Sequence, residues 1–209
     1  MSRSIEQSYD SAAKAYAERL FDELEGKPLD RHLLNRFAES LEGKGLVADL
    51  GCGPGHVAKY LHNTGLEMCG IDISPEMIRI AKEMSPEVEF KVGDMLSLDI
   101  ADGSLAGIVA FYSIVHFDSS QLAAALSECR RVMKDGALIL MAFHIGDEVI
   151  HVDDLFERPV NLDFRFHQPA NVMNALRSQR FTVIESTERE PYEGAEHQSR
   201  RSYLLARAN

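Results

Sequence analysis

Residues 47–55 decide the fold of this chain, and they read Val47-Ala48-Asp49-Leu50-Gly51-Cys52-Gly53-Pro54-Gly55. A short apolar strand runs into an acid and then into glycines at alternate positions, and a helical pattern follows over residues 56–62. Glycines let the backbone turn sharply and let a ligand lie against bare main chain. A second strand, over residues 66–71, ends at Asp72, where an α/β domain places its ribose-binding acid. The two segments together predict a nucleoside-binding α/β domain.

The glycines alone leave the class of nucleoside open. The pattern G-x-G-x-x-G fails from Gly51, because His56 stands at the third glycine, but Gly53-x-Gly55-x-x-Ala58 satisfies its looser dinucleotide form. Asp49 favours a different ligand, because a carboxylate beside the turn suits an ammonium and a sulfonium better than a pyrophosphate.

From Asp49 to Asp72 the chain closely resembles the class I S-adenosylmethionine-dependent methyltransferases of the small-molecule type. The same resemblance recurs in Val92-Gly93-Asp94-Met95-Leu96 and in the segment 131–138, so that it covers roughly residues 45–143. It implies S-adenosylmethionine as the cofactor, S-adenosylhomocysteine as its product, and methyl transfer to an O or N atom of a small polar molecule. An NAD(P)-dependent oxidoreductase and a non-catalytic cofactor-binding protein remain as alternatives.

Hydrophobic periodicity predicts alternating helices and strands along one domain. Helices are expected over residues 5–24, 29–41, 56–62, 75–84, 121–133 and 169–179. Strands are expected over 46–50, 66–71, 88–92, 105–112, 137–143, 181–186 and 201–207. This alternation predicts an α/β fold with a doubly wound, seven-stranded, mostly parallel sheet of the Rossmann-like kind. The loop 188–199 is too short for a crossover helix, so the last two strands should form an antiparallel hairpin.

We divide this single domain into four parts. Residues 1–43 should form a helical lid or cap, 44–143 the cofactor-binding core, 144–167 an acceptor-side insert of loops or short elements, and 168–209 a helix and hairpin.

The composition of the chain limits the classes of molecule that it is expected to bind. The net charge of −11, from 33 acids and 22 bases, disfavours nucleic acid. No apolar run is long enough to span a membrane, and residues 1–7 lack the pattern of a signal peptide. Three cysteines without metal-type spacing fit reduced thiols in the cytoplasm. We therefore expect a cytoplasmic monomer or homodimer that acts on a small molecule.

The resemblance implies a role for each residue of the cofactor site. Asp49 would face the cofactor ammonium, and Asp72 would accept from the ribose hydroxyls. Ile73 and Met77 would pack on the adenine, or serve only as core residues, and Asp94 with Met95 would contact the adenine edge. The remaining expected cofactor-binding residues are Gly51, Cys52, Gly53, Gly55, Leu96, Phe111 and Tyr112.

On the acceptor side, His116 is our candidate base for a hydroxyl acceptor, with a structural histidine as the alternative. Tyr9 and Tyr16 resemble the aromatic residues of a lid helix, although a buried helix face would give the same spacing. In the insert we expect His144 to line the acceptor pocket and Arg165, with Arg200 and Arg201, to hold an anionic acceptor. The histidines and acids of the insert match no tight ligand pattern, so we predict no metal site.

Overall fold

The computed structural model of the protein describes residues 4–194 and 196–209. Its helices are α1 (Ile5–Leu20), the 3-10 helix η1 (Glu23–Gly26), α2 (Pro28–Leu41), α3 (His56–His62), α4 (Pro75–Met84), α5 (Ser119–Val132) and α6 (Pro169–Ser178). Its strands are β1 (Val47–Leu50), β2 (Met68–Asp72), β3 (Glu89–Val92), β4 (Leu105–Phe111), β5 (Met133–His144), β6 (Val149–Asp154), β7 (Pro159–Arg165), β8 (Phe181–Arg189) and β9 (Arg201–Ala208).

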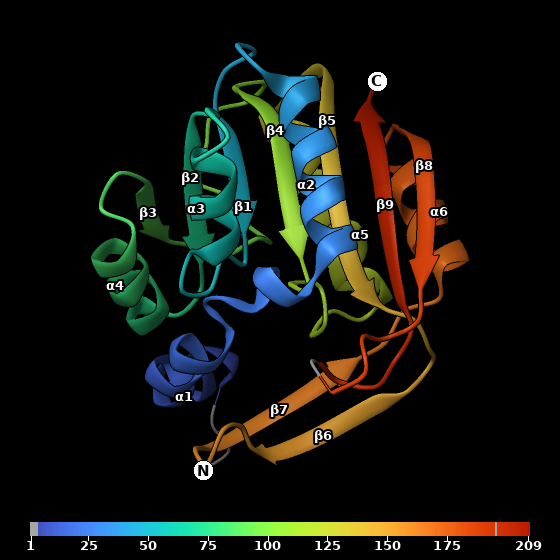
Figure 1. Cartoon of the computed structure of the whole chain (residues 1–209). Coiled ribbons are helices and arrows are strands. Elements are labelled where there is room, and N and C mark those ends of the chain that lie inside the picture. Colours follow the sequence, from blue (N-terminus) through green and yellow to red (C-terminus); the bar gives the residue numbers. More distant parts are fainter. Residues whose placement is uncertain (1–3, 195) are drawn as a thin grey trace.

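Seven strands form one twisted sheet in the order β3-β2-β1-β4-β5-β9-β8 (Figure 1). The pairs among β1 to β5 are parallel, whereas β9 runs antiparallel to both β5 and β8. The predicted fold class is therefore confirmed, including the reversed last strand. A dinucleotide domain would carry a sixth parallel strand at this place, so the topology does not support the oxidoreductase alternative.

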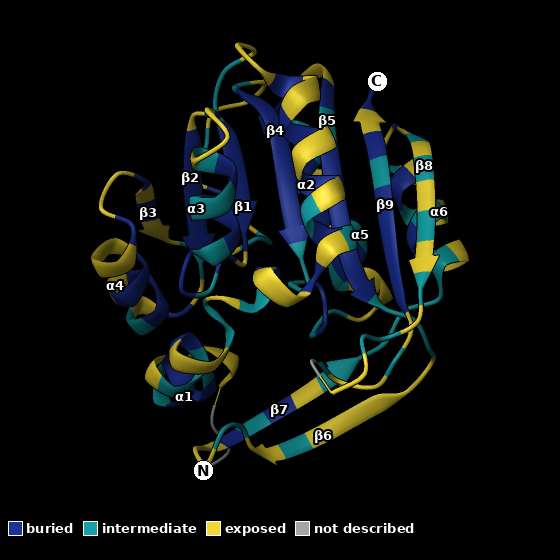
Figure 2. Ribbon diagram, in the orientation of Figure 1, coloured by how far each residue is buried: buried dark blue, intermediate teal, exposed yellow. Residues whose placement is uncertain are grey.

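Helices cover both faces of the sheet, and each face has its own apolar core. Side chains of α5 and α6, such as Leu126 and Leu176, pack on one face. Side chains of α2, α3 and α4, such as Phe37, Leu61 and Ile78, pack on the other. The central strands are buried nearly throughout, as Figure 2 shows. This double cover leaves only the strand ends open for a ligand.

The expected insert over residues 144–167 is a regular two-stranded antiparallel hairpin, β6 with β7. Its strand β7 buries Val160 and Leu162, which pack against Ala12 of α1. The alternation Val160-x-Leu162-x-Phe164 was a strand signal that the charged residues around it obscured. The hairpin lies across the carboxyl ends of the central strands, next to α1 (Figure 1).

Three predicted boundaries are wrong. The first helix ends at Leu20, and the segment predicted to continue it is η1, because Glu23 turns inward to pair with His56. Helix α5 begins at Ser119, two residues before the predicted start at 121, because the Asp118 carboxylate caps it by accepting the backbone N–H groups of Ser120 and Gln121. The strand predicted to begin at 137 already begins at Met133 in β5, where the register with β4 shifts.

None of the helices within residues 4–194 and 196–209 is long and apolar enough to cross a membrane.

Candidate active site

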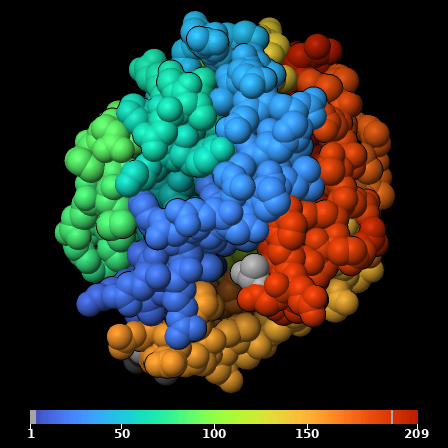
Figure 3. All heavy atoms as spheres, in the orientation of Figure 1, coloured from blue at the N-terminus to red at the C-terminus, as the bar shows by residue number. Residues whose placement is uncertain are grey.

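A pocket opens at the carboxyl ends of β1, β2 and β4, where the sheet order reverses between β1 and β4. Ligands of open α/β sheets bind at such a switch point. Figure 3 shows the N-terminal helices, the β6–β7 hairpin and the β8–β9 connection meeting around a hollow at this end of the molecule. Predicted residues that line the pocket are Tyr9, Tyr16, Gly51, Cys52, Gly53, Asp72, Ile73, Met77, Asp94, Met95, Phe111, Tyr112 and His116.

The glycine loop forms the floor of the pocket. Gly51 has a φ of +69°, and a Cβ there would stand 2.4 Å from the Cβ of Ser113. Only glycine fits, because both the backbone conformation and the approach of the β4–α5 loop exclude a side chain. Gly53 follows with its N–H pointing at Asp72, to which it donates at 2.8 Å. The loop therefore presents bare main chain to the pocket.

Asp72 ends β2 and fixes the rim of the pocket. Its Oδ2 accepts the N–H of Gly53, and its Oδ1 accepts the N–H of Ser74 at 2.9 Å. Burial raises the pKa of Asp72, and the two backbone N–H groups oppose that shift. Each carboxylate oxygen keeps a free lone pair, so Asp72 can still accept two hydroxyl groups.

Asp49 lies under the glycine loop and does not line the pocket. It is 2 % exposed, and its Oδ2 has no hydrogen-bond partner among the described residues. Burial raises the pKa of Asp49 to about 7, against the lowering influence of His56 and the Ala58 N–H. A cation that reached this carboxylate would restore its ionised form.

The raised pKa of Asp49 predicts how the affinity for the cofactor depends on pH. If the cofactor ammonium pairs with ionised Asp49, binding competes with protonation of that carboxylate. The affinity for S-adenosylhomocysteine should then fall as the pH drops below about 7, by up to about tenfold per pH unit, and stay constant above it. Calorimetry from pH 5.5 to 8.5 measures this dependence. The variant Asp49→Asn should bind more weakly at pH 8 and lose the slope, and parallel slopes in both proteins would assign the titration to another group.

Two further predicted residues stand beside the pocket with a defined geometry. Asp94 opens the turn after β3, and its Oδ1 accepts the N–H of Leu96 at 2.8 Å, which leaves Oδ2 for a ligand. Tyr112 has a φ of +54°, an uncommon conformation for a residue with a side chain. Its N–H donates to the carbonyl of Ala142 at 2.8 Å, and its hydroxyl joins the tyrosine of β9, Tyr203, at 3.1 Å.

His116 is held between two elements that are distant in sequence. Its Nδ1 lies 2.8 Å from the backbone carbonyl of Asp163 in β7, so Nδ1 carries the proton. Its Nε2 lies 2.8 Å from the hydroxyl of Tyr9 and therefore accepts from it. Burial lowers the pKa of His116, and the Asp163 carbonyl opposes that shift only in part. His116 is thus a neutral imidazole at neutral pH, with its basic nitrogen at the pocket.

Helix α1 covers the pocket and is fixed on both sides. Ala13 and Ala17 pack against Met77 of α4, and the carboxylate of Asp10 accepts from the hydroxyl of Ser74 at 2.6 Å. The opposite side of α1 packs on the hairpin. By contrast, α2, which we grouped with α1 in the lid, packs on the sheet.

The sequence analysis missed three polar residues of this pocket, Glu23, His56 and Ser113. His56 Nε2 lies 3.1 Å from Glu23, while its Nδ1 is buried and has no partner in the described chain. Burial favours a neutral Glu23, but His56 and Lys27 outweigh it and lower its pKa to about 2. The place of His56 directly after Gly55 was the available signal, whereas nothing in the sequence singled out Glu23.

Some predicted residues lie elsewhere. Gly55 is the N-cap of α3, and Leu96 follows Asp94 outside the pocket lining. His144 stacks on Phe166 and hydrogen-bonds Ser199 at 2.7 Å, so it does not line the pocket. Arg165 lines a second pocket, next to the first, and His116 lines both.

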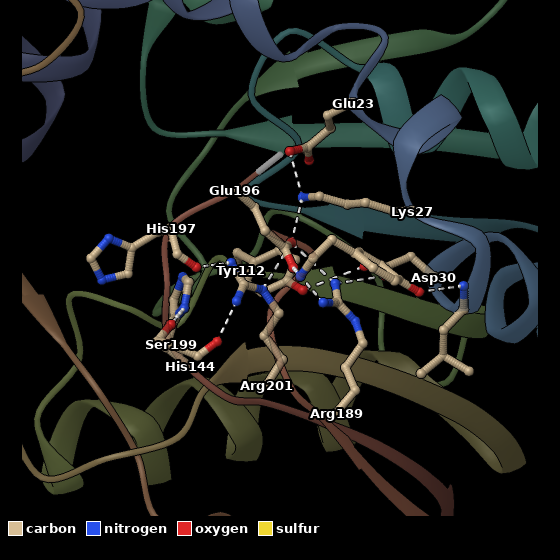
Figure 4. A network of polar contacts seen from close by, with 12 residues as sticks. Glu23, Lys27, Asp30, Tyr112, His144, Arg189, Glu196, His197, Ser199 and Arg201 are labelled. Atoms are coloured by element: carbon tan, nitrogen blue, oxygen red, sulfur yellow. Dashed lines mark hydrogen bonds and ion pairs between the residues drawn. The ribbon is translucent and has the colours of Figure 1, made fainter. Parts of the chain in front are cut away.

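The other two arginines expected at the acceptor, Arg200 and Arg201, already have carboxylate partners. Arg200 pairs with Glu188 at 2.7 Å on the surface. Arg201 is 2 % exposed and pairs with Glu196 at 3.1 Å. It belongs to a buried network of charged side chains that connects α2 to the β8–β9 connection (Figure 4). Because both arginines already have carboxylate partners, the structure does not support them as acceptor ligands.

The pocket fits the cofactor that the sequence predicts. Three buried polar atoms in and under it lack partners in the described chain: Asp49 Oδ2, His56 Nδ1 and Ser113 Oγ. Buried polar atoms are normally satisfied, so these atoms suit a ligand that carries charged and hydrogen-bonding groups. Acidic ends on β1 and β2 match an ammonium and a ribose, and Ile73 and Met77 supply apolar walls. Within residues 4–194 and 196–209, no three His, Cys, Asp or Glu side chains form a group that could hold a metal ion.

Comparisons with known proteins agree with this geometry. Residues 47–136 match the model of a methyltransferase domain family. A malonyl-[acyl-carrier protein] O-methyltransferase of Pectobacterium atrosepticum is 31 % identical over 67 % of this chain and 53 % of its own length. A magnesium-protoporphyrin O-methyltransferase of Rhodobacter capsulatus is 35 % identical over 46 % of this chain and 44 % of its own length. The chain therefore spans about half the length of these curated relatives.

A solved structure shows the same fold. The S-adenosylmethionine-dependent methyltransferase of Methanosarcina mazei superposes with a TM-score of 0.71 at 19 % identity, over 78 % of this chain and 92 % of that one. The glycine loop between two strand-end acids, the reversed β9 and the matched domain all agree. Residues 47–136 therefore match a methyltransferase domain, and the chain is similar in fold to the class I S-adenosylmethionine-dependent methyltransferases.

Proposed function

We propose that this protein transfers the methyl group of S-adenosylmethionine to an oxygen atom of a small polar molecule. The observation that carries the proposal is the neutral His116 with its basic nitrogen at the same pocket as the glycine loop. An oxygen acceptor is also the kind that the names of two relatives state, since both are O-methyltransferases.

In this proposal Asp49, under the glycine loop, and two acids of the pocket, Asp72 and Asp94, each take one part of the cofactor. Asp49 would attract the ammonium, and Asp72 would accept from the ribose hydroxyls while the loop N–H groups hold its carboxylate in place. Asp94 Oδ2 would accept from the adenine amine, and Ile73 and Met77 would supply apolar contacts to the adenine. Phe111 and Tyr112, where β4 ends, would lie on the side of the sulfur.

When bound, the cofactor would supply a methyl group on a sulfonium: an oxygen lone pair forms a bond to the methyl carbon as the carbon–sulfur bond breaks, and the electron pair of that bond stays on sulfur. The protein then has two tasks, to align the acceptor and to remove its proton. His116 receives the proton on Nε2, and the Asp163 carbonyl holds the ring in the tautomer whose Nε2 carries no proton of its own. Tyr9 lies at that nitrogen, so the acceptor proton can pass to the Tyr9 oxygen as the Tyr9 proton moves to His116. Helix α1 excludes water from this contact and acts as the lid.

The cofactor assignment is tested by calorimetry with S-adenosylhomocysteine and with NAD. Only the first should bind. A screen of hydroxyl and amine acceptors with radiolabelled cofactor then tests the transfer. Binding without transfer to any acceptor would favour the non-catalytic alternative, and transfer only to amines would contradict the oxygen assignment.

Asp72→Asn should weaken S-adenosylhomocysteine binding by at least about tenfold, because two hydroxyls lose a charged acceptor. The amide keeps an oxygen for one of the two backbone N–H groups, that of Gly53, so the glycine loop should stay folded. Asp99→Asn, an exposed acid near the same sheet edge, is the matched control and should bind normally. If both variants bound S-adenosylhomocysteine with equal affinity and had unchanged circular dichroism spectra, Asp72 would not be a ribose ligand.

A further inference from the structure

A second pocket adjoins the first on the acceptor side and shares His116 with it. The N-terminus of α1 and the β6–β7 hairpin form its walls, through Ser4, Ile5, His151, Asn161, Asp163 and Arg165. The first pocket is largely apolar at its acceptor end, with Val115, Phe117 and Ile5, whereas the second is mostly polar. If the reactive atom of an acceptor molecule lies at His116, the other end of that molecule therefore lies in the second pocket. We call this pocket the polar compartment.

Arg165 brings a positive charge to this compartment. Its backbone N–H donates to the carbonyl of Val115 at 2.6 Å, which fixes the end of β7 against the loop that carries His116. In residues 4–194 and 196–209, no carboxylate forms an ion pair with its guanidinium, and no hydrogen bond of that side chain is found. Asp118 lies near enough for Arg165 to contribute to its lowered pKa, but the N-cap bonds of α5 occupy that carboxylate and dominate the shift.

Of the other charged groups that line the compartment, His151 and Asp163 compensate each other. His151 Nδ1 lies 2.8 Å from Asp163, and its Nε2 lies 3.0 Å from Asp153. The hydrogen bonds to Asp163 and Asp153 raise the pKa of His151, which favours its charged form. This leaves the guanidinium of Arg165 as the cation that a ligand can neutralise, and a guanidinium binds planar carboxylates in a bidentate manner.

We propose that the methyl acceptor is a hydroxy acid, whose hydroxyl stands at Tyr9 and His116 and whose carboxylate pairs with Arg165 in the second pocket. This assignment rests on the proposed function, since it names the substrate class of that site. The single charge of Arg165 suits a carboxylate. A phosphate dianion would stand near the carboxylate of Asp163 as well, at a cost in repulsion. Because His116 lines both pockets, the hydroxyl and the carboxylate belong to one small molecule.

The test uses the full chain saturated with S-adenosylhomocysteine and three probes of similar shape: 3-hydroxybenzoate, 3-hydroxybenzamide and 3-hydroxyphenyl phosphate. Their dissociation constants are measured by NMR titration. The benzoate should bind at least about tenfold more tightly than the neutral amide, and it should shift the resonances of His116. Arg165→Gln should abolish that preference and leave the affinity for S-adenosylhomocysteine within about twofold. Arg158→Gln, at the exposed turn of the same hairpin, is the matched control and should keep the preference.

The outcomes separate this inference from the function on which it rests. If S-adenosylhomocysteine does not bind, the proposed function is wrong and the acceptor assignment falls with it. If it binds but the benzoate fails to bind, binds no better than the amide, or keeps its preference in Arg165→Gln, only the hydroxy acid is wrong. Tighter binding of the phosphate than of the benzoate would overturn the carboxylate in favour of a phosphate.

Discussion

Replacing His116 with alanine is expected to lower kcat for transfer to a hydroxyl acceptor by about 10²–10⁴-fold, the usual contribution of a general base. The affinity for S-adenosylhomocysteine should change by no more than a few-fold, because His116 stands on the acceptor side of the pocket. Wild-type activity should decline on the acidic side of the pH profile below the usual histidine value of about 6.5, since burial lowers the pKa of His116. Removal of the imidazole should abolish that acidic limb.

Two further variants sharpen this experiment. Tyr9→Phe keeps the ring but removes the hydroxyl that lies 2.8 Å from His116 Nε2, so a relay through Tyr9 requires kcat to fall. His32→Ala, on the exposed side of α2, is the control and should be active. A His116→Ala protein with near-normal turnover of a hydroxyl acceptor and an unchanged pH profile would show that His116 only joins α1 to the hairpin. A small decrease in the kcat of His116→Ala with an amine acceptor would instead show that this acceptor needs no base.

Replacing Glu196 with alanine is expected to lower the free energy of unfolding by about 3–5 kcal/mol, which corresponds to a fall in Tm of roughly 6–20 °C. The Glu196 carboxylate is 4 % exposed and contacts three cations, Lys27 at 3.6 Å, Arg201 at 3.1 Å and Arg189. Figure 4 shows Glu196 among these cations, each of which would lose one carboxylate partner on its removal. Leaving a buried charge without its partner lowers the free energy of unfolding by more than the intact ion pair had added to it.

The destabilisation caused by Glu196→Ala should depend on pH. Burial raises the pKa of Glu196, but its bonds to Arg189, the Tyr192 N–H and Arg201 lower it more, so the net pKa is below its usual value. Such an acid stabilises the fold above its unfolded pKa and loses that contribution as the pH falls through the folded one. The difference between wild type and variant should therefore be full at pH 7 and shrink below about pH 4.

Thermal and urea unfolding measure both quantities, with Glu193→Ala, an exposed acid of the same connection, as the control. A Glu196→Ala protein as stable as this control at pH 7 would show that the network contributes nothing net. Glu196→Gln should lie between the two, because the amide keeps hydrogen-bond acceptors but not the charge.

The network also shows what the sequence could not predict. Arg189 pairs with Asp30, which is 159 residues away, and both are buried. Nothing in the order of residues distinguishes Arg189 and Arg201 from surface arginines, since which carboxylates meet them depends on how α2 packs against the sheet that contains β8 and β9. The same holds for Arg165. We grouped it with Arg200 and Arg201, and packing then gave partners to those two and left Arg165 at a pocket.

The sequence by itself determined the features that depend on neighbouring residues. The glycine turn follows from backbone conformations that only glycine adopts readily, and the strands and helices follow from the two hydrophobic periods. The acids at the ends of β1 and β2 could be placed because parallel strands end at one edge of a sheet. Tertiary structure alone decided which distant side chains meet: Tyr9 with His116, 107 residues apart, and the hairpin with α1. The physical reason is that burial and pairing energies depend on distance in space, and separation along the chain carries almost no information about that distance.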